Sequence, residues 1–282
     1  MRSASVGGGP GGDEPPLALV DTHAHLDARQ FAGEPTVAIL GRAAAAGVTR
    51  VVSIGVDLAT SRRAVALAEA HPGLWATVGV SPNDLAGFDD TVMAQLAALA
   101  AHPRVVAVGE IGLDYHWNRS PRAVQRQALL AQLDLAHPLD RPVVIHSRDA
   151  REDTTELLLA WASAAGAPAR PLGVMHCFSG DRALAEELHA AGFLISLAGV
   201  VTYPGARALS EVAAALPDEA LLLETDAPYL PPQSYRGRRN EPAYVRATAE
   251  HVAALRGTSL AQLAAVTSAN AARLFRWNGR TV

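Results

Sequence analysis

Six histidine and carboxylate residues follow apolar segments of the sequence, at positions where β-strands are expected to end. They are His23, His25, Glu110, His146, His176 and Asp226. A single histidine in such a position is usually a hydrogen-bonded structural residue. Burying six ionisable groups together is costly unless they are paired or hold a metal. We therefore predict a metal centre.

The six residues outnumber the ligands of one tetrahedral zinc ion. They suit two divalent ions about 3.5–4 Å apart that share a bridging carboxylate and a hydroxide. A mixed set of imidazoles and carboxylates would accept Zn, Mn, Fe or Mg. The prediction is therefore two divalent ions, with Mg, Mn and Zn as the main candidates.

Short apolar segments alternate along the chain with alanine- and leucine-rich segments. The alanine- and leucine-rich segments have apolar residues at intervals of three and four, as helices packed on a sheet do. Apolar strands separated by helices indicate a parallel sheet that is covered on both faces. We predict one (β/α)8 barrel of the TIM type, with an open doubly wound sheet as the alternative. The predicted strands are 17–24, 48–56, 74–80, 105–113, 142–147, 172–177, 192–199 and 220–226.

In a barrel of this type the active site lies at the C-terminal ends of the strands. Five of the predicted strands end in the six residues named above. Side chains two positions apart in a strand point the same way. We therefore expect His23 and His25 to point together into the mouth of the barrel.

The composition limits the possible partners. The net charge of −4 gives no overall sign of nucleic-acid binding, so phosphate contacts would have to come from a local arginine cluster. The single cysteine, Cys177, cannot form an internal disulfide. We find no apolar run long enough to span a membrane, and residues 1–16 have the composition of a flexible tail rather than a signal peptide. We expect a cytoplasmic protein with no membrane contact and no obligate protein partner, in which residues 17–282 form the barrel.

Arginines cluster after the last predicted strand. Arg236, Arg238 and Arg239 lie within four positions in the segment 231–242. Guanidinium groups pair well with phosphate oxygens, so these residues are candidates for binding a nucleic-acid backbone. The alternative is a solvated surface loop. Arg148 is a further phosphate candidate, with a salt bridge to Asp149 or Glu152 as the alternative.

The ordered motifs resemble those of the TatD-related metal-dependent deoxyribonucleases, within the amidohydrolase-like metal-dependent hydrolase superfamily. The resemblance covers residues 18–276. The matching segments are DTHAHLD (21–27), VGEIGLDY (108–115), VVIHSRDA (143–150), MHCFSG (175–180), LLLETDAPYL (221–230), RGRRNEP (236–242) and TSANAARLF (267–275).

The resemblance implies a role for each of the six residues. His23, His25, Glu110 and Asp226 would hold the first metal, and Glu110 would bridge to the second. That second metal would also be bound by His146 and His176. Many amidohydrolase relatives bridge their metals through a carbamylated lysine, but this chain contains no lysine. Glu110 is therefore the expected bridge.

The implied reaction is hydrolysis of DNA phosphodiester bonds by a metal-activated hydroxide, from a chain end or on a single strand. Glu110 and Asp226 are the expected catalytic residues, with Asp226 orienting or deprotonating the water. Glu224, two positions before Asp226, is expected to orient one of the metal ligands.

One motif departs from the family. After the third predicted strand the family has a GVHP-type motif, whereas this chain reads VGVSPND (78–84), with Ser81 in place of the histidine. Serine does not carry protons near pH 7 as histidine does. Ser81 and Asn83 remain candidate substrate-binding residues, and Asn83 or His116 could replace the missing side chain.

Two further hypotheses stay open. The first, motivated by Ser81, is an ester or amide hydrolase of the same superfamily that acts on a small molecule or an aminoacyl-tRNA. The second is a metal-stabilised binding protein without turnover. The complete set of six ligands argues against the second, because a protein that had lost its activity is expected to lose ligands first.

Overall fold

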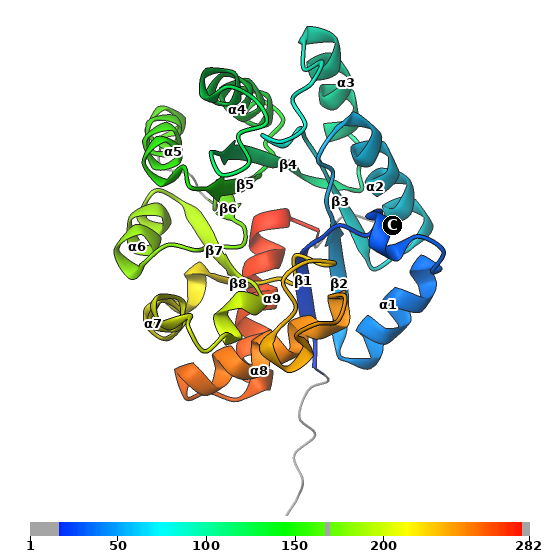
Figure 1. Ribbon diagram of the computed structural model, residues 1–282, viewed down its shortest axis with the longest axis vertical. Helices are drawn as coiled ribbons and strands as arrows, with labels where there is room; N and C mark the ends of the chain where they lie inside the picture. The colour runs from blue at the N-terminus through cyan, green and yellow to red at the C-terminus, as the bar shows by residue number, and fades with distance from the viewer. Residues whose placement is uncertain (1–16, 167–169, 278–282) are drawn as a thin grey trace, which may run out of the picture.

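The computed structural model describes residues 17–166 and 170–277, so the tail predicted for residues 1–16 lies outside the described residues. Within this part of the chain, eight parallel strands form one sheet in the order β1 to β8 (Figure 1). The predicted strands are all present, with ends that differ by a few residues. They are β1 (Leu19–Ala24), β2 (Val48–Ser53), β3 (Leu74–Val78), β4 (Val105–Asp114), β5 (Val143–Arg148), β6 (Gly173–Met175), β7 (Phe193–Leu197) and β8 (Leu221–Leu223).

Hydrogen bonds between the first strand and the segment after the last strand close the sheet. The backbone N–H of Asp226 donates to the carbonyl of His23 over 2.9 Å, and that of His25 donates to the carbonyl of Ala227 over 2.7 Å. Ala24 and Ala227 also form a parallel bridge. The prediction of a single TIM-type barrel is therefore confirmed, and the open sheet is excluded.

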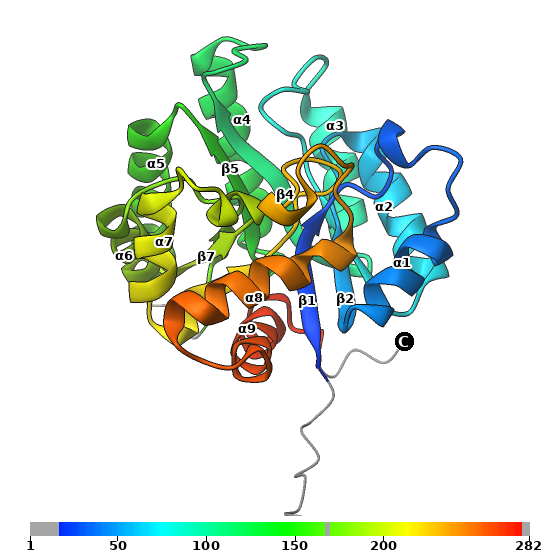
Figure 2. The ribbon, with the colours of Figure 1, turned by 60° about the horizontal axis from the view of Figure 1, so that its bottom comes forward.

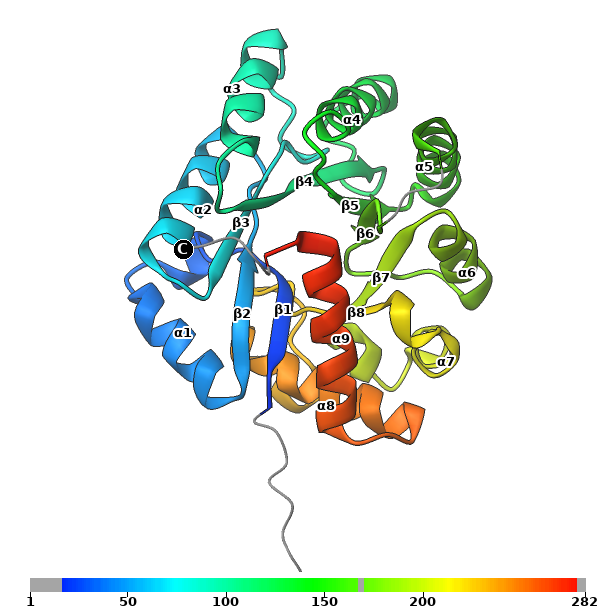
Figure 3. The same ribbon diagram turned by 180° about the vertical axis from the view of Figure 1, so that it is seen from behind.

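Nine α-helices in the described part of the chain surround the strands (Figures 1 and 3). Capping residues mark the first turn of several of these helices. Asp57 and Ser259, for example, form capping boxes with Thr60 and Gln262, which satisfy N–H groups at the helix start. The helices are α1 (Thr36–Ala45), α2 (Leu58–Ala70), α3 (Asp90–Ala100), α4 (Arg122–Ala136), α5 (Arg151–Ala165), α6 (Arg182–Ala190), α7 (Arg207–Ala215), α8 (Val245–Arg256) and α9 (Leu260–Phe275).

The strands are apolar throughout because both of their faces are buried. In β5, for example, Val143 and Ile145 belong to the core between strands and helices, whereas Val144 belongs to the core inside the barrel. Leu274 and Phe275 at the end of α9, followed by Trp277, join that inner core. Figure 2 shows α9 at the end of the barrel opposite the loop between β8 and α8. Access to the barrel interior is therefore left at the C-terminal ends of the strands.

The inner core also explains the direction of several polar side chains. Side chains two positions apart in a strand point the same way. His146, His176 and Glu224 therefore lie on the inner side of the barrel, like Val144, Val174 and Leu222 two positions before them.

Among residues 17–166 and 170–277, no helix is long and apolar enough to cross a membrane.

Candidate metal centre

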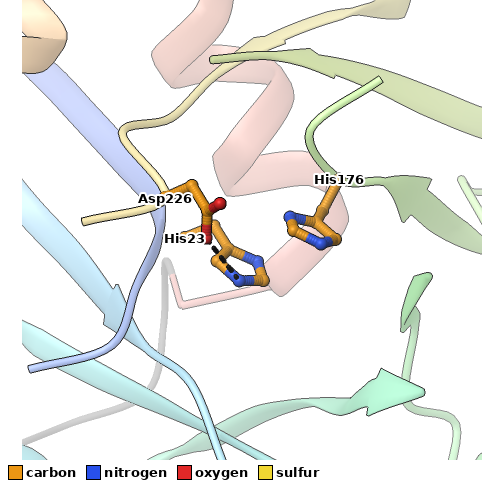
Figure 4. A group of neighbouring side chains, drawn as sticks. All are labelled: His23, His176 and Asp226. Carbon is orange, nitrogen blue, oxygen red and sulfur yellow. Dashed lines mark ion pairs between the residues drawn. The ribbon is translucent and has the colours of Figure 1, made fainter. Parts of the chain in front are cut away.

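The six predicted ligands lie together at the C-terminal end of the barrel. His23, Glu110 and His146 belong to β1, β4 and β5, whereas His25, His176 and Asp226 follow β1, β6 and β8. Four of them are buried, namely His23, Glu110, His176 and Asp226. Figure 4 shows how side chains from three separate segments converge. Residues up to 203 positions apart in sequence thus share one site, as the prediction requires.

Glu110 lies between two pairs of histidines. Its Oε2 is 3.5 Å from Nε2 of His23 and 3.7 Å from Nε2 of His25. Its Oε1 is 2.9 Å from Nδ1 of His146 and 3.3 Å from Nε2 of His176. The two oxygens of one carboxylate therefore face two different sets of nitrogen donors. A ligand that bridges two metal ions needs this arrangement.

Asp226 completes the set around the first pair of histidines. Its Oδ1 is 3.4 Å from Nε2 of His25 and 3.7 Å from Nε2 of His23. The two Nε2 atoms of His23 and His25 are themselves 3.2 Å apart, so the two side chains do point the same way. The predicted consequence of their two-residue spacing is confirmed.

The donor atoms fit divalent ions. Possible ligand atoms lie within 4.8 Å of one another in the groups His23–His25–Glu110 and Glu110–His146–His176. These groups correspond to the two predicted metal positions, and Glu110 belongs to both. A third group, His23–His176–Asp226, overlaps them. Imidazole nitrogens and carboxylate oxygens in such close groups are the donors expected for zinc, manganese or magnesium.

Two further carboxylates orient histidines from outside the cluster. Oε1 of Glu224 is 3.2 Å from Nδ1 of His176 and accepts a hydrogen bond from the backbone N–H of Cys177 over 2.7 Å. Oδ2 of Asp114 is 3.1 Å from Nε2 of His146. An ionised carboxylate only accepts hydrogen bonds, so each of these nitrogens carries the proton. The nitrogens that face Glu110 would become electron-pair donors when a metal displaces their protons.

Asp114 was missed by the sequence reasoning, although it lies in the motif VGEIGLDY. It is fully buried, and it also accepts a hydrogen bond from Nδ2 of Asn83 over 2.9 Å. Burial alone would raise the pKa of Asp114, but the hydrogen bonds from His146 and Asn83 outweigh burial and lower that pKa. A carboxylate four positions after Glu110 in one strand, which places both on one face, was a signal that could have identified it.

The histidines and carboxylates of the cluster change one another's pKa values. Burial alone would raise the pKa of Glu110, but the charge of His176 and hydrogen bonds from His146 and His176 hold it well below its usual range. Burial would lower the pKa of His176, but Glu110 and Glu224 outweigh burial and raise it well above its usual range. The pKa values of His25 and His146 are raised in the same way, by Asp226 and Asp114 together with Glu110. The pKa of His23 is lowered, first by burial and then by the charge of His176.

Metal binding is therefore expected to release protons and to weaken as the pH falls. The raised pKa values of His25, His146 and His176 mean that protons compete with a metal at pH values above the usual imidazole pKa of about 6.5. Calorimetric titration with Mn²⁺ in buffers of different ionisation enthalpy measures the released protons. We expect net proton release near neutral pH and weaker binding about two pH units lower. Equal affinity at both pH values would contradict this prediction.

The segment that departs from the family places Ser81 and Asn83 differently. The Ser81 hydroxyl donates to Asp84 in the same loop over 2.5 Å. Asn83, through Asp114, is one contact away from His146. His116 is exposed, and its Nδ1 is 3.0 Å from Oδ2 of Asp149. Both possible substitutes for the missing histidine thus contact Asp114, Asn83 through its side chain and His116 through its backbone N–H over 3.0 Å. Only the side chain of Asn83 is directed at this carboxylate.

Of the four arginines predicted to bind phosphate, one is paired with a protein carboxylate and three are exposed. The Arg239 guanidinium forms an ion pair with Glu34 over 2.7 Å and lies 4.3 Å from the centre of the Phe31 ring. It therefore ties the loop after β8 to the segment after β1, and its donors are already used by protein groups. Arg236 and Arg238 are exposed. Arg148 is also exposed and lies over the ring of Trp117 at 5.7 Å.

The fold and the site together define a class of protein. An eight-stranded parallel barrel with a histidine–carboxylate cluster at the C-terminal ends of its strands is the architecture of the amidohydrolase-like metal-dependent hydrolases. Residues 20–276 match the family model described as TatD related DNase. The chain belongs to the TatD-related DNase family.

Relatives of known sequence or structure agree with this assignment. The uncharacterized metal-dependent hydrolase YabD of Bacillus subtilis is 40% identical over 261 residues, which are 92% of this chain and 100% of YabD. The 3'-5' ssDNA/RNA exonuclease TatD of Cronobacter sakazakii is 40% identical over 245 residues, which are 85% of this chain and 91% of the exonuclease. The crystal structure of YJJV, a TatD homolog from Escherichia coli K12, has a TM-score of 0.84 at 35% identity. That comparison covers 92% of this chain and 98% of YJJV.

Proposed function

We propose that the protein is a two-metal deoxyribonuclease that hydrolyses phosphodiester bonds of single-stranded DNA, preferentially from an end. The position of Glu110 carries the proposal, because each of its oxygens faces a separate histidine pair. The similarity to an exonuclease that acts on single-stranded DNA and RNA supports the choice of substrate.

The residues would divide between two ions. His23, His25, Glu110 and Asp226 would hold one ion, and the second would be held by Glu110, His146 and His176. Bound divalent ions would supply positive charge next to the phosphate oxygens and would lower the pKa of the attacking water. Glu224 and Asp114 would keep a proton on Nδ1 of His176 and on Nε2 of His146. The other nitrogen of each ring, which faces Glu110, would then bind the metal.

Asp226 is the proposed group that orients the water and accepts its proton. Its pKa is below the usual range, because the hydrogen bond from His25 and the charges of the neighbouring histidines outweigh burial. The carboxylate is therefore ionised at neutral pH and has lone pairs to accept a hydrogen bond from water. Arg148, Arg236 and Arg238 are exposed and available to bind substrate phosphates. Arg239 is the weakest of the four candidates, because Glu34 already occupies it.

The test is an incubation of the purified protein with end-labelled single-stranded DNA and Mg²⁺ or Mn²⁺. We expect metal-dependent release of nucleotides that stops with a chelator and is absent in Glu110→Ala. A duplex of the same sequence should be degraded more slowly, and the label at either end reports the direction of cleavage. Wild-type protein that releases no nucleotides with any divalent metal would overturn the proposal.

Ser81 motivates one alternative, an ester or amide hydrolase of the same superfamily. The family histidine that this serine replaces would provide a proton carrier, whereas the Ser81 hydroxyl donates to Asp84. Assays with a chromogenic phosphodiester, a lactone and an aminoacyl ester separate the two functions. The nuclease proposal predicts a clear preference for the phosphodiester, and preference for either carboxylic ester would favour the alternative.

A further inference from the structure

Two aromatic side chains stand out at the mouth of the barrel. Among the phenylalanines, tyrosines and tryptophans in the described part of the chain, only Trp117 and Tyr229 are exposed, at 57% and 47%. Trp117 follows β4, the strand of Glu110, and Tyr229 follows Asp226 by three positions. An exposed aromatic ring near a proposed nuclease centre offers a flat surface on which a base can stack.

Trp117 is held next to the proposed metal centre by a short chain of contacts. Its backbone N–H donates to Oδ1 of Asp114 over 2.9 Å. The other oxygen of that carboxylate, Oδ2, is 3.1 Å from Nε2 of His146. One buried carboxylate therefore connects the backbone of Trp117 to a proposed metal ligand. The backbone of Trp117 is therefore held beside the cluster, whereas its indole is exposed.

Arg148 lies beside this indole. Arg148 is the register partner of Asp114 between β5 and β4, and its guanidinium is 5.7 Å from the centre of the Trp117 ring. The pair combines a flat apolar face with a cation that suits phosphate. Proteins that bind single strands without sequence preference use this combination of stacking and positive charge.

Tyr229 occupies the corresponding position on the other side of the cluster. Its ring centre is 5.9 Å from that of His25, in an edge-on arrangement, and its backbone N–H donates to the carbonyl of Asp226 over 2.8 Å. In the strand order, β8 and β1 lie across the barrel from β4 and β5. The two exposed rings thus lie on either side of the six proposed ligands.

We propose that Trp117, paired with Arg148, is a stacking site for a base of single-stranded nucleic acid next to the bond that is cut, with Tyr229 as the second stacking surface. This inference rests on the proposed nuclease function and extends it to the way in which the substrate is held. A base in a duplex is already stacked and paired, so such a site favours a single strand or a frayed end. Because every base has a π-face, the site should be tolerant of sequence.

The test compares two substrates that differ only in their bases. One is an oligothymidylate, and the other is an oligomer of the same length whose sugars lack bases. We expect Trp117→Ala to lower kcat/KM on the oligothymidylate about tenfold or more, chiefly through KM, and to leave kcat/KM on the abasic oligomer unchanged. Trp117→Phe should retain most of the activity. Leu130→Ala removes an exposed apolar side chain from α4 and is the matched control.

Fluorescence supplies a second readout that needs no turnover. The other tryptophans, Trp75, Trp161 and Trp277, are buried or half-buried. Stacking of a base on Trp117 should therefore quench the tryptophan emission of the wild-type protein. The oligothymidylate should cause this quenching in the presence of a chelator, whereas the abasic oligomer and the Trp117→Phe variant should show none.

The outcomes separate this inference from the function on which it rests. Equal losses on both substrates in Trp117→Ala, or no loss on either, would overturn the stacking site and leave the nuclease intact. Wild-type protein that cleaves neither substrate would overturn the proposed function. An oligothymidylate that is cleaved without quenching Trp117 would also contradict the inference.

Discussion

Glu110→Gln is expected to lower kcat for single-stranded DNA by about a thousandfold or more, equivalent to about 4 kcal/mol of activation free energy. The substitution keeps the size of the side chain but leaves a single oxygen with lone pairs, because an amide nitrogen is only a donor. It therefore cannot face both histidine pairs as a ligand, as the two oxygens of Glu110 do. The variant should lose one of the two ions.

Metal content after dialysis, determined by elemental analysis, checks this expectation together with kcat. Glu219→Gln is the matched control, since that glutamate is exposed on the 3-10 turn just before β8 and its side chain is remote from the cluster. The control should retain both ions and full activity. The pKa of His176 should also fall in Glu110→Gln, because Glu110 is the largest of the influences that raise it. A variant that keeps two ions and normal turnover would show that Glu110 does not bridge.

Asp226→Asn is expected to reduce kcat by about a hundredfold or more, or about 3 kcal/mol, and to retain two ions at saturating Mn²⁺. The asparagine keeps one oxygen that can face a metal but cannot take a proton from water. Asp226 has a φ of +57°, in the left-handed region that asparagine and aspartate tolerate better than most residues. The substitution therefore changes the charge without adding backbone strain, which alanine would do.

Thermal unfolding checks that the variant is folded. Metal analysis then separates the role of Asp226 as a metal ligand from its role as a proton acceptor. Asp134→Asn, at an exposed position of α4, is the control and should match the wild-type protein. Loss of an ion in Asp226→Asn at saturating metal would show that Asp226 acts mainly as a metal ligand and not mainly as a proton acceptor. Full activity in this variant would exclude Asp226 as the group that accepts the proton.

The sequence was sufficient to predict the barrel and the meeting of the six side chains, because both follow from simple periodicities. Apolar strands that alternate with helices require a parallel sheet, and the C-terminal ends of such strands meet at one end. The spacing of His23 and His25 then predicts that they point the same way, and their Nε2 atoms are indeed 3.2 Å apart.

Irregular strand pairing limited what periodicity could predict. The pairing of β1 shifts register between Asp21 and Ala24, next to His23, and that of β4 shifts between Val108 and Ile111, next to Glu110. Such shifts re-aim side chains near active sites. The contact of each Glu110 oxygen with a different histidine pair therefore needed the structure.

The arginines and Asp114 show a second limit. Arg239 and its partner Glu34 are 205 positions apart in sequence, so the sequence could not reveal that this guanidinium is already paired. Asp114 was overlooked because one buried carboxylate in an apolar strand carries no spacing signal unless Glu110 is taken as its partner. Its contacts to His146 in β5 and to Asn83 in the loop after β3 join separate parts of the barrel, which the sequence alone does not bring together.

Anomalous scattering from crystals grown with Mn²⁺ tests the two-metal centre most directly. We expect two peaks about 3.5–4 Å apart at the C-terminal mouth of the barrel. One should lie among His23, His25, Glu110 and Asp226, and the other among Glu110, His146 and His176. A single peak, or two peaks of which only one contacts Glu110, would contradict the proposed bridging role and the mechanism that depends on it.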